Sequence, residues 1–143
     1  MGSSLASKAG VAFGAFYVAL GVIGFAVTGW GTQWTLNTNE ALLGVAVNPF
    51  HNVAHIGIGA LLLILSLQKN TAAAEGALMG VGLFYIVAFV IGVTAGDNLT
   101  ILSITGQDAL ANFFHLVSGV FLLVVGLLSS SVTASQAKKR GLA

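Results

Sequence analysis

Four long stretches without a charged residue divide this chain: residues 10–39, 41–68, 76–96 and 109–137. Each contains the ~20 predominantly apolar residues that a helix needs to cross the hydrocarbon core of a bilayer. Only 6% of the 143 residues are charged and 57% are hydrophobic, whereas about 25% are charged in an average soluble domain. A soluble fold of this size could not bury so much apolar surface. The sequence therefore predicts an all-α integral membrane four-helix bundle.

The predicted spans are residues 10–30, 49–68, 76–96 and 108–129, within one domain that occupies residues 1–143. Residues 130–143 are polar and basic, and we expect them to form a frayed cytoplasmic tail. The basic residues fall on one side of this arrangement and three acidic residues on the other: Lys8, Lys69, Lys138, Lys139 and Arg140 against Glu40, Asp97 and Asp108. The positive-inside rule then predicts a plasma-membrane protein with both termini in the cytoplasm.

Two features of the first outer connection follow from this orientation. Trp30 and Trp34 are expected at the outer membrane interface, where amphipathic indole rings collect. Residues 41–47 form an apolar stretch that is expected either to lie on the membrane surface or to fold back over the bundle.

Composition and motifs exclude several classes of function. The chain has no cysteine, which excludes disulfides, thiolate metal sites and a catalytic thiol. A net charge of +1 gives no sign of nucleic-acid binding. No serine–histidine–acid spacing, phosphate loop or pair of catalytic carboxylates is present, so we expect a non-enzymatic protein. Its expected partners are the lipid bilayer and, through glycine-lined helix faces, a membrane-protein complex or a second copy. Three pairs of small residues are expected to be structural and to let helices approach closely: Gly10 with Gly14, Gly76 with Gly80, and Gly92 with Gly96.

An internal repeat relates the two halves of the chain. The pattern Phe-Tyr-x at 16–18, with Ile-Gly at 23–24, recurs 68 residues later, so Tyr17 and Tyr85 are equivalent and are expected to steady the bundle by hydrogen bonds. Two spans return the chain to the side of the membrane on which it started, so both halves of the repeat have the same orientation in the bilayer. Halves with the same orientation indicate a pseudo-twofold axis along the membrane normal. A second set recurs with an offset of 60: Asn52, His55, Gly59, Leu62 and Leu63 recur as Asn112, His115, Gly119, Leu122 and Leu123.

Polar residues line one helical face at the start of the second and fourth predicted spans. Steps of four, three and four residues keep side chains on one face of an α-helix. A polar side chain in hydrocarbon needs a partner and usually faces the bundle interior. The spacing therefore predicts a polar cluster between helices two and four, in the outer leaflet. Its two halves are Asn48, Asn52, His55 and Gly59, and Asp108, Asn112, His115 and Gly119.

Three kinds of site fit this cluster. The first is a hydrogen-bond network of His51, His55, His115, Asn48, Asn52, Asn112 and Asp108 that fixes the register of helices two and four and needs no cofactor. The second is a b-type haem with His55 and His115 as axial ligands, for which Gly59 and Gly119 leave room beside the porphyrin. The third is a zinc or copper ion bound by His51, His55 and His115.

His51 breaks the symmetry of the repeat, because Ala111 takes its place in the second half. It is expected to be solvated near the lipid headgroups, and His115 is expected to be the useful partner of His55. Proton exchange between the histidines and Asp108 is a further alternative. No acidic residue lies inside a predicted span to continue such a path inward.

The motif Asn-Pro-x-His-Asn-x-x-His at 48–55 and the run Asn-x-x-His-x-x-x-Gly at 112–119 resemble small four-span bacterial membrane proteins grouped as domain-of-unknown-function family 4383. The resemblance covers most of the chain and implies a bacterial membrane location and a four-helix fold. It implies no activity, because the family has none established. Similar proteins tend to carry Asp directly before the Asn of helix four, where this chain has Ala111, so an Asp-to-His contact at four residues' spacing is in question.

Overall fold

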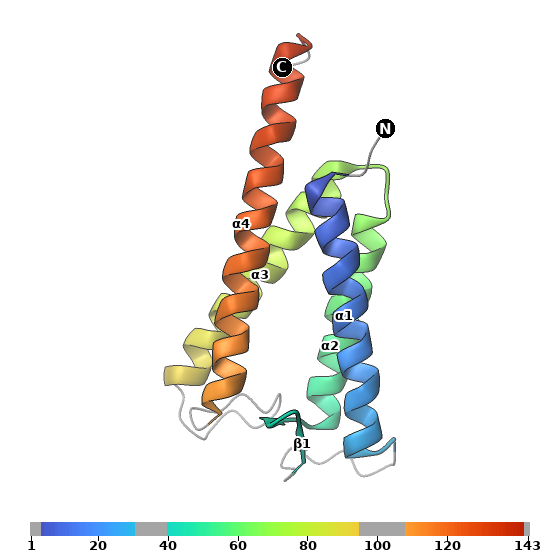
Figure 1. Cartoon of the computed structure of the whole chain (residues 1–143), viewed down its shortest axis with the longest axis vertical. Helices are drawn as coiled ribbons and strands as arrows, with labels where there is room; N and C mark the ends of the chain where they lie inside the picture. The colour runs from blue at the N-terminus through green and yellow to red at the C-terminus, as the bar shows by residue number, and fades with distance from the viewer. Residues whose placement is uncertain (1–3, 31–39, 95–107, 142–143) are drawn as a thin grey trace.

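The computed structural model describes residues 4–30, 40–94 and 108–141, and the predictions made for Trp34, Gly96 and Asp97 lie outside them. Within these ranges the chain forms α1 (Leu5–Thr28), α2 (Pro49–Ser66), α3 (Thr71–Thr94) and α4 (Ala109–Lys139), with a small hairpin of β1 (Ala41–Leu42) and β2 (Val45–Ala46) (Figure 1). All four helices are long and apolar enough to cross a membrane. The predicted helical bundle is confirmed.

The helices begin where side chains satisfy their first backbone N–H groups. Ser4 Oγ accepts a hydrogen bond from Ser7 N at 3.0 Å, so α1 starts five residues before the predicted span. Asn48 Oδ1 accepts from His51 N at 2.8 Å, and Pro49 follows it in the first turn of α2, where its missing N–H costs nothing. Asn70 Oδ1 accepts from Ala72 N at 3.1 Å as α3 begins.

The end of α4 differs from the expected frayed tail. The helix continues without a break and ends at Lys139, after which the chain turns at Gly141 with φ 67°. Alanine, glutamine and lysine are good helix formers, and no glycine or proline interrupts the run from 127 to 140. Lys138 and Lys139 also lie favourably at the negative end of the helix dipole. The helix therefore projects well beyond its neighbours, as Figure 1 shows.

The helices are arranged as two antiparallel pairs. α1 packs along α2, and α3 packs along α4, whereas no Cα atoms of α2 and α4 approach within 8 Å in the described residues. The two pairs converge at the end that carries both termini and diverge toward the β hairpin (Figure 1). This pairing agrees with the tandem two-helix repeat expected from the sequence.

Glycines at repeat-equivalent positions set the close approach inside each pair. A methyl group at Gly59 would lie 2.6 Å from Gly14 O, and one at Gly119 would lie 2.9 Å from Gly82 O. These distances are too short for any side chain, so both contacts require glycine. Gly14 and Gly82 are 68 residues apart and Gly59 and Gly119 are 60 apart. The offsets found in the sequence therefore relate equivalent contacts in space.

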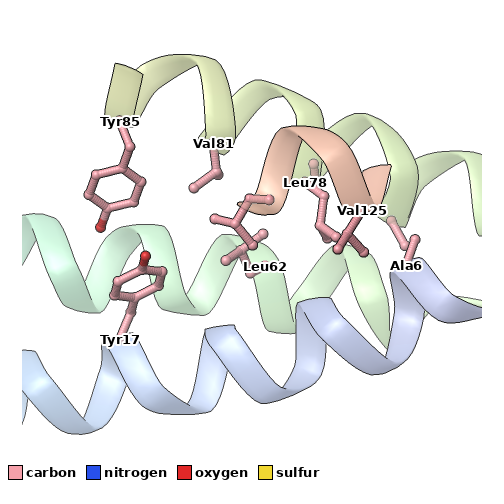
Figure 2. Close-up of a cluster of buried hydrophobic side chains, with 10 residues drawn as sticks. Ala6, Tyr17, Leu62, Leu78, Val81, Tyr85 and Val125 are labelled. Atoms are coloured by element: carbon pink, nitrogen blue, oxygen red, sulfur yellow. The ribbon is translucent and has the colours of Figure 1, made fainter. Parts of the chain in front are cut away.

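A compact group of side chains joins the two pairs near the end where they converge. Ala6, Leu62, Leu78 and Leu122 are each 0% exposed. Figure 2 shows several of these core side chains between the helices, with Tyr17 and Tyr85 at one end of the group. Beyond the tyrosines the pairs separate, and the space between them becomes the candidate site.

Candidate functional site

A cavity of about 210 Å³ lies between the two helix pairs at the end covered by the β hairpin. All four helices and the hairpin contribute to its wall, and most of the lining side chains are apolar. The polar exceptions are the three histidines, two tyrosines, one asparagine and one serine. The lining residues are Phe16, Tyr17, Leu20, Leu42, Leu43, Val45, Val47, His51, Asn52, His55, Tyr85, Leu110, Ala111, Phe114, His115 and Ser118.

The structure brings the three histidines together in this wall. His51 and His55 share a hydrogen bond between their Nε2 atoms at 2.8 Å, and their ring centroids are 4.5 Å apart. The His51 ring lies 6.5 Å from that of His115 on the other helix pair. His51, at 6% exposure, is buried rather than solvated. The expectation that His51 is solvated is therefore wrong, because its ring lies in the cavity wall between His55 and His115. The histidine that bonds to His55 is His51 rather than the expected His115.

Two tyrosines complete the group of rings. Tyr17 lies 5.5 Å from His55, Tyr85 lies 5.5 Å from His115, and the two tyrosine rings are 5.3 Å apart. The two ring pairs occupy equivalent positions of the repeat, although Tyr17 meets His55 edge-on at 81° and Tyr85 stacks on His115 at 29°. Figure 2 shows the two hydroxyl groups pointing toward one another. The sequence predicted that these tyrosines would steady the bundle through hydrogen bonds. The Tyr17 hydroxyl has the Tyr85 hydroxyl and the Ser118 side chain as hydrogen-bonding neighbours, but within the described residues neither tyrosine hydroxyl makes a hydrogen bond of full geometry.

Four buried polar atoms in the cavity wall make no hydrogen bond of full geometry within the described residues: Tyr17 Oη, Tyr85 Oη, His55 Nδ1 and His115 Nδ1. Buried polar atoms in folded proteins almost always have a partner, and an exception calls for a specific explanation. A bound molecule in the cavity would supply hydrogen-bonding groups at this place.

The asparagines of the two motifs act inside their own helix pairs. Asn52 Nδ2 donates to Thr28 Oγ1 at 2.9 Å, which ties α2 to α1. A methyl group at Gly24 would collide with the Asn52 side chain, and one at Gly92 would collide with that of Asn112. The expected network between helices two and four is therefore corrected for these residues: each asparagine packs on the glycine of its own partner helix.

Asp108 joins the hairpin to α4. Its Oδ1 accepts from Ala111 N at 2.8 Å as the helix cap, and its Oδ2 accepts from Ala46 N at 2.8 Å in β2. Leu43 and Gly44 turn the hairpin with φ of 55° and 84°. The predicted apolar stretch 41–47 thus folds back over the bundle, the second of its two expected placements. Both carboxylate oxygens of Asp108 serve this structure rather than a histidine.

The glycines proposed to make room for haem lie elsewhere. Gly59 faces α1 and Gly119 faces α3, and neither lines the cavity. Within the described ranges, no group of three or more histidine, cysteine or acidic side chains has an arrangement that could hold a metal ion. The three histidines share a cavity, but one hydrogen bond already joins two of them.

The opposite end of the bundle contains a buried acid that sequence reasoning missed. Glu75 lies inside α3 at 5% exposure, and its Oε1 accepts hydrogen bonds from Ser129 Oγ at 3.1 Å and Thr133 Oγ1 at 2.8 Å. Ser129 Oγ also accepts from Ala6 N at 3.4 Å. The sequence placed Glu75 in a connection because the charge-free run begins after it. The helix-forming residues 72–75 were the available signal.

Comparison with known proteins gives a family but no activity. A family model described as Domain of unknown function (DUF4383) matches residues 8–128. No curated protein and no solved structure matches the chain. Together with the four apolar helices, the match indicates a multi-pass membrane protein of unknown function.

Proposed function

The chain belongs to the DUF4383 family of unknown function, and we propose that it is a non-enzymatic accessory protein that binds a small lipophilic molecule in its cavity. The proposal includes a place in the bacterial plasma membrane, with both termini in the cytoplasm and the cavity in the outer leaflet. The basic residues at the converging end support this orientation through the positive-inside rule.

The observation that carries the proposal is a mostly apolar wall in which four buried polar atoms make no hydrogen bond of full geometry within the described residues. Ligand sites in proteins are concave and mostly apolar, with a few placed polar groups that fix the orientation of the ligand. The pseudo-symmetric ring pairs, Tyr17 with His55 and Tyr85 with His115, supply those groups from both halves of the repeat.

Native mass spectrometry of the purified protein in lipid nanodiscs tests binding directly. Wild-type protein should retain an added small mass, and Ala111→Phe, which fills the cavity wall, should lose it. Val132→Phe on the exposed part of α4 is the matched control and should retain the mass. Circular dichroism checks that each variant folds. The double variant Tyr17→Phe/Tyr85→Phe keeps the volume and should weaken retention. A wild-type protein that retains nothing would overturn the proposal.

Haem ligation by His55 and His115 is the second candidate, since both histidines occupy equivalent positions of the repeat and line one cavity. It requires His55 to give up its hydrogen bond with His51. In the part of the chain that the structure describes, no Lys or Arg lines the cavity to pair with haem propionates. A reduced-minus-oxidised spectrum of protein from a haem-sufficient host is the test. A stoichiometric Soret band that both His55→Ala and His115→Ala abolish would establish haem, and no band would exclude it.

A further inference from the structure

We infer that the cavity takes a neutral, lipid-soluble ring compound with carbonyl groups, of the quinone class, which enters sideways from the outer leaflet between α1 and α4. This inference rests on the proposed function and names the ligand class and its route. Three properties of the wall lead to it: its lack of charge, its hydrogen-bond donors and its exposed apolar rim.

Among the described residues, no Lys, Arg, Asp or Glu side chain lines the wall. A charged ligand would lose its water on entry without meeting an opposite charge, which strongly disfavours its binding. The nearby acid, Asp108, has both carboxylate oxygens engaged by backbone N–H groups. Fatty acids, phospholipid headgroups and other ions are therefore poor occupants, and a neutral molecule is favoured.

The two tyrosine hydroxyls define the polar part of the ligand. A hydroxyl donates one hydrogen bond, and a carbonyl oxygen has two lone pairs, so Tyr17 and Tyr85 could both donate to one carbonyl. Their rings are 5.3 Å apart, whereas a third ring between them would need about 7 Å at contact distances of 3.5 Å on each face. The ligand therefore cannot insert between the rings. Because both hydroxyls are buried, the tyrosine side chains must turn toward the cavity to donate to the ligand.

Aromatic side chains around the rest of the cavity suit a flat ligand. The three histidine rings and the tyrosines lie within 6.5 Å of their neighbours, and such faces pack against planar rings. An engineered cavity of about 150 Å³ holds benzene, so a cavity of about 210 Å³ matches one substituted ring. A longer apolar tail would remain outside.

Several lining residues form an exposed apolar rim through which such a tail would leave. Phe16 of α1 is 55% exposed, Phe114 of α4 is 51% exposed, and Leu43 at the tip of the hairpin is 85% exposed. The hairpin contacts α1 through β1 and α4 through β2, so it covers the end of the cavity that points away from the bundle. The exposed rim side chains face lipid if the helices span the bilayer, which makes lateral entry the open route.

Binding of three probes with equal tails tests the ligand class. The probes are a fully substituted benzoquinone with a decyl tail, decanoate and decylbenzene, each added to the protein in phosphatidylcholine nanodiscs. We expect the quinone to bind ~10-fold more tightly than decylbenzene, because of the hydrogen bonds from the tyrosines. Tyr17→Phe/Tyr85→Phe should remove that difference and leave decylbenzene binding unchanged. Ser131→Ala, outside the cavity, is the matched control.

The outcomes separate this inference from the proposed function. If decanoate binds as tightly as the quinone, or the tyrosine variants bind the quinone as wild type does, the ligand class is wrong and the cavity is still a binding site. If no probe binds and wild-type protein retains no native small molecule, both proposals fail.

The entry route is tested separately by labelling a single introduced cysteine. Because the chain contains no cysteine, no other thiol reacts. Ser118→Cys places one thiol in the cavity wall. A lipid-soluble maleimide should modify it at least ~10-fold faster than a charged, water-soluble thiol reagent, and the quinone should slow the reaction. Gln136→Cys, on the projecting end of α4, is the control and should react with both reagents, which shows that each reagent is active. Equal rates for the two reagents at Ser118→Cys would overturn lateral entry.

Discussion

Gly59 and Gly57 are two residues apart on α2 and have different surroundings. A methyl group at Gly59 would lie within 2.8 Å of backbone and side-chain atoms of α1, whereas one at Gly57 would meet nothing within 4 Å. Helices in membranes associate largely through close packing, so small residues matter only where backbones meet. The requirement for glycine is therefore set by the neighbouring helix.

Gly59→Ala should destabilise the bundle by about 1–3 kcal/mol, because the new methyl group forces α1 and α2 apart. Gly119→Ala should have the same effect on α3 and α4, since its contact is equivalent. Thermal unfolding in detergent measures both. Gly57→Ala is the matched control and should unfold at or above the wild-type temperature. Equal unfolding temperatures for Gly59→Ala and Gly57→Ala would contradict the packing role.

Glu75 of α3 accepts two hydrogen bonds from α4, and one of the donors, Ser129 Oγ, accepts in turn from Ala6 N of α1. Glu75→Ala should destabilise the bundle by about 1–3 kcal/mol, because the Ser129 and Thr133 hydroxyls lose their acceptor. Glu75→Gln keeps an acceptor oxygen and should lose less. Thermal unfolding of the two variants is the measurement. A Glu75→Gln protein as unstable as Glu75→Ala would show that the negative charge, rather than the hydrogen bonds, matters.

Among the secondary-structure elements, the β hairpin depends most on tertiary contacts. Its two pairs, Ala41 with Ala46 and Leu42 with Val45, are too few to be stable alone. Asp108 Oδ2 anchors it to α4, and Leu43 turns it in the left-handed region. The sequence indicated an apolar stretch at 41–47 and left its position open, because that position depends on a carboxylate 62 residues later.

Asp108→Ala should loosen the hairpin and fray the first turn of α4, at a cost of about 0.5–2 kcal/mol for the lost cap alone. Asp108→Asn keeps one acceptor oxygen, which serves either the cap or the hairpin, and should be intermediate. Hydrogen exchange of the Ala46 amide measures the contact with the hairpin, and exchange of the Ala111 amide measures the helix cap. Asn48→Ala, which removes the cap of α2, is the matched control and should leave Ala111 protected. Unchanged exchange at Ala46 in Asp108→Ala would contradict the anchoring role.

In the molecule as a whole, the two helix pairs converge at the end with both termini and open toward the hairpin. The orientation proposed above places the converging end in the cytoplasm. In intact cells, Glu40→Cys should react with a membrane-impermeant maleimide, and Gln136→Cys should react only after lysis. The chain has no other thiol to interfere. Labelling of Gln136→Cys in intact cells would reverse the orientation and place the cavity in the inner leaflet.

Much of the architecture could be predicted from residues near one another in the chain. The charge-free runs predicted four membrane-spanning helices. Matching residues 68 and 60 positions apart predicted the internal repeat. Both signals are local or periodic, because the bilayer imposes the same length and the same apolar requirement on each span. The sequence also singled out the three histidines that share the cavity wall.

The tertiary structure alone decided what those residues contact. Asn52 and His55 lie on one predicted face, yet Asn52 bonds to Thr28 of α1 and His55 bonds to His51. The two helix pairs diverge toward the hairpin (Figure 1), and their packing separates α2 from α4 and brings Tyr17 against Tyr85. This packing depends on close contacts between residues far apart in the sequence. Helical periodicity shows which residues share a face of one helix, but not which residues of another helix they contact. The sequence by itself thus determined the spans, the repeat and the polar faces, and the packing of the two pairs made the cavity.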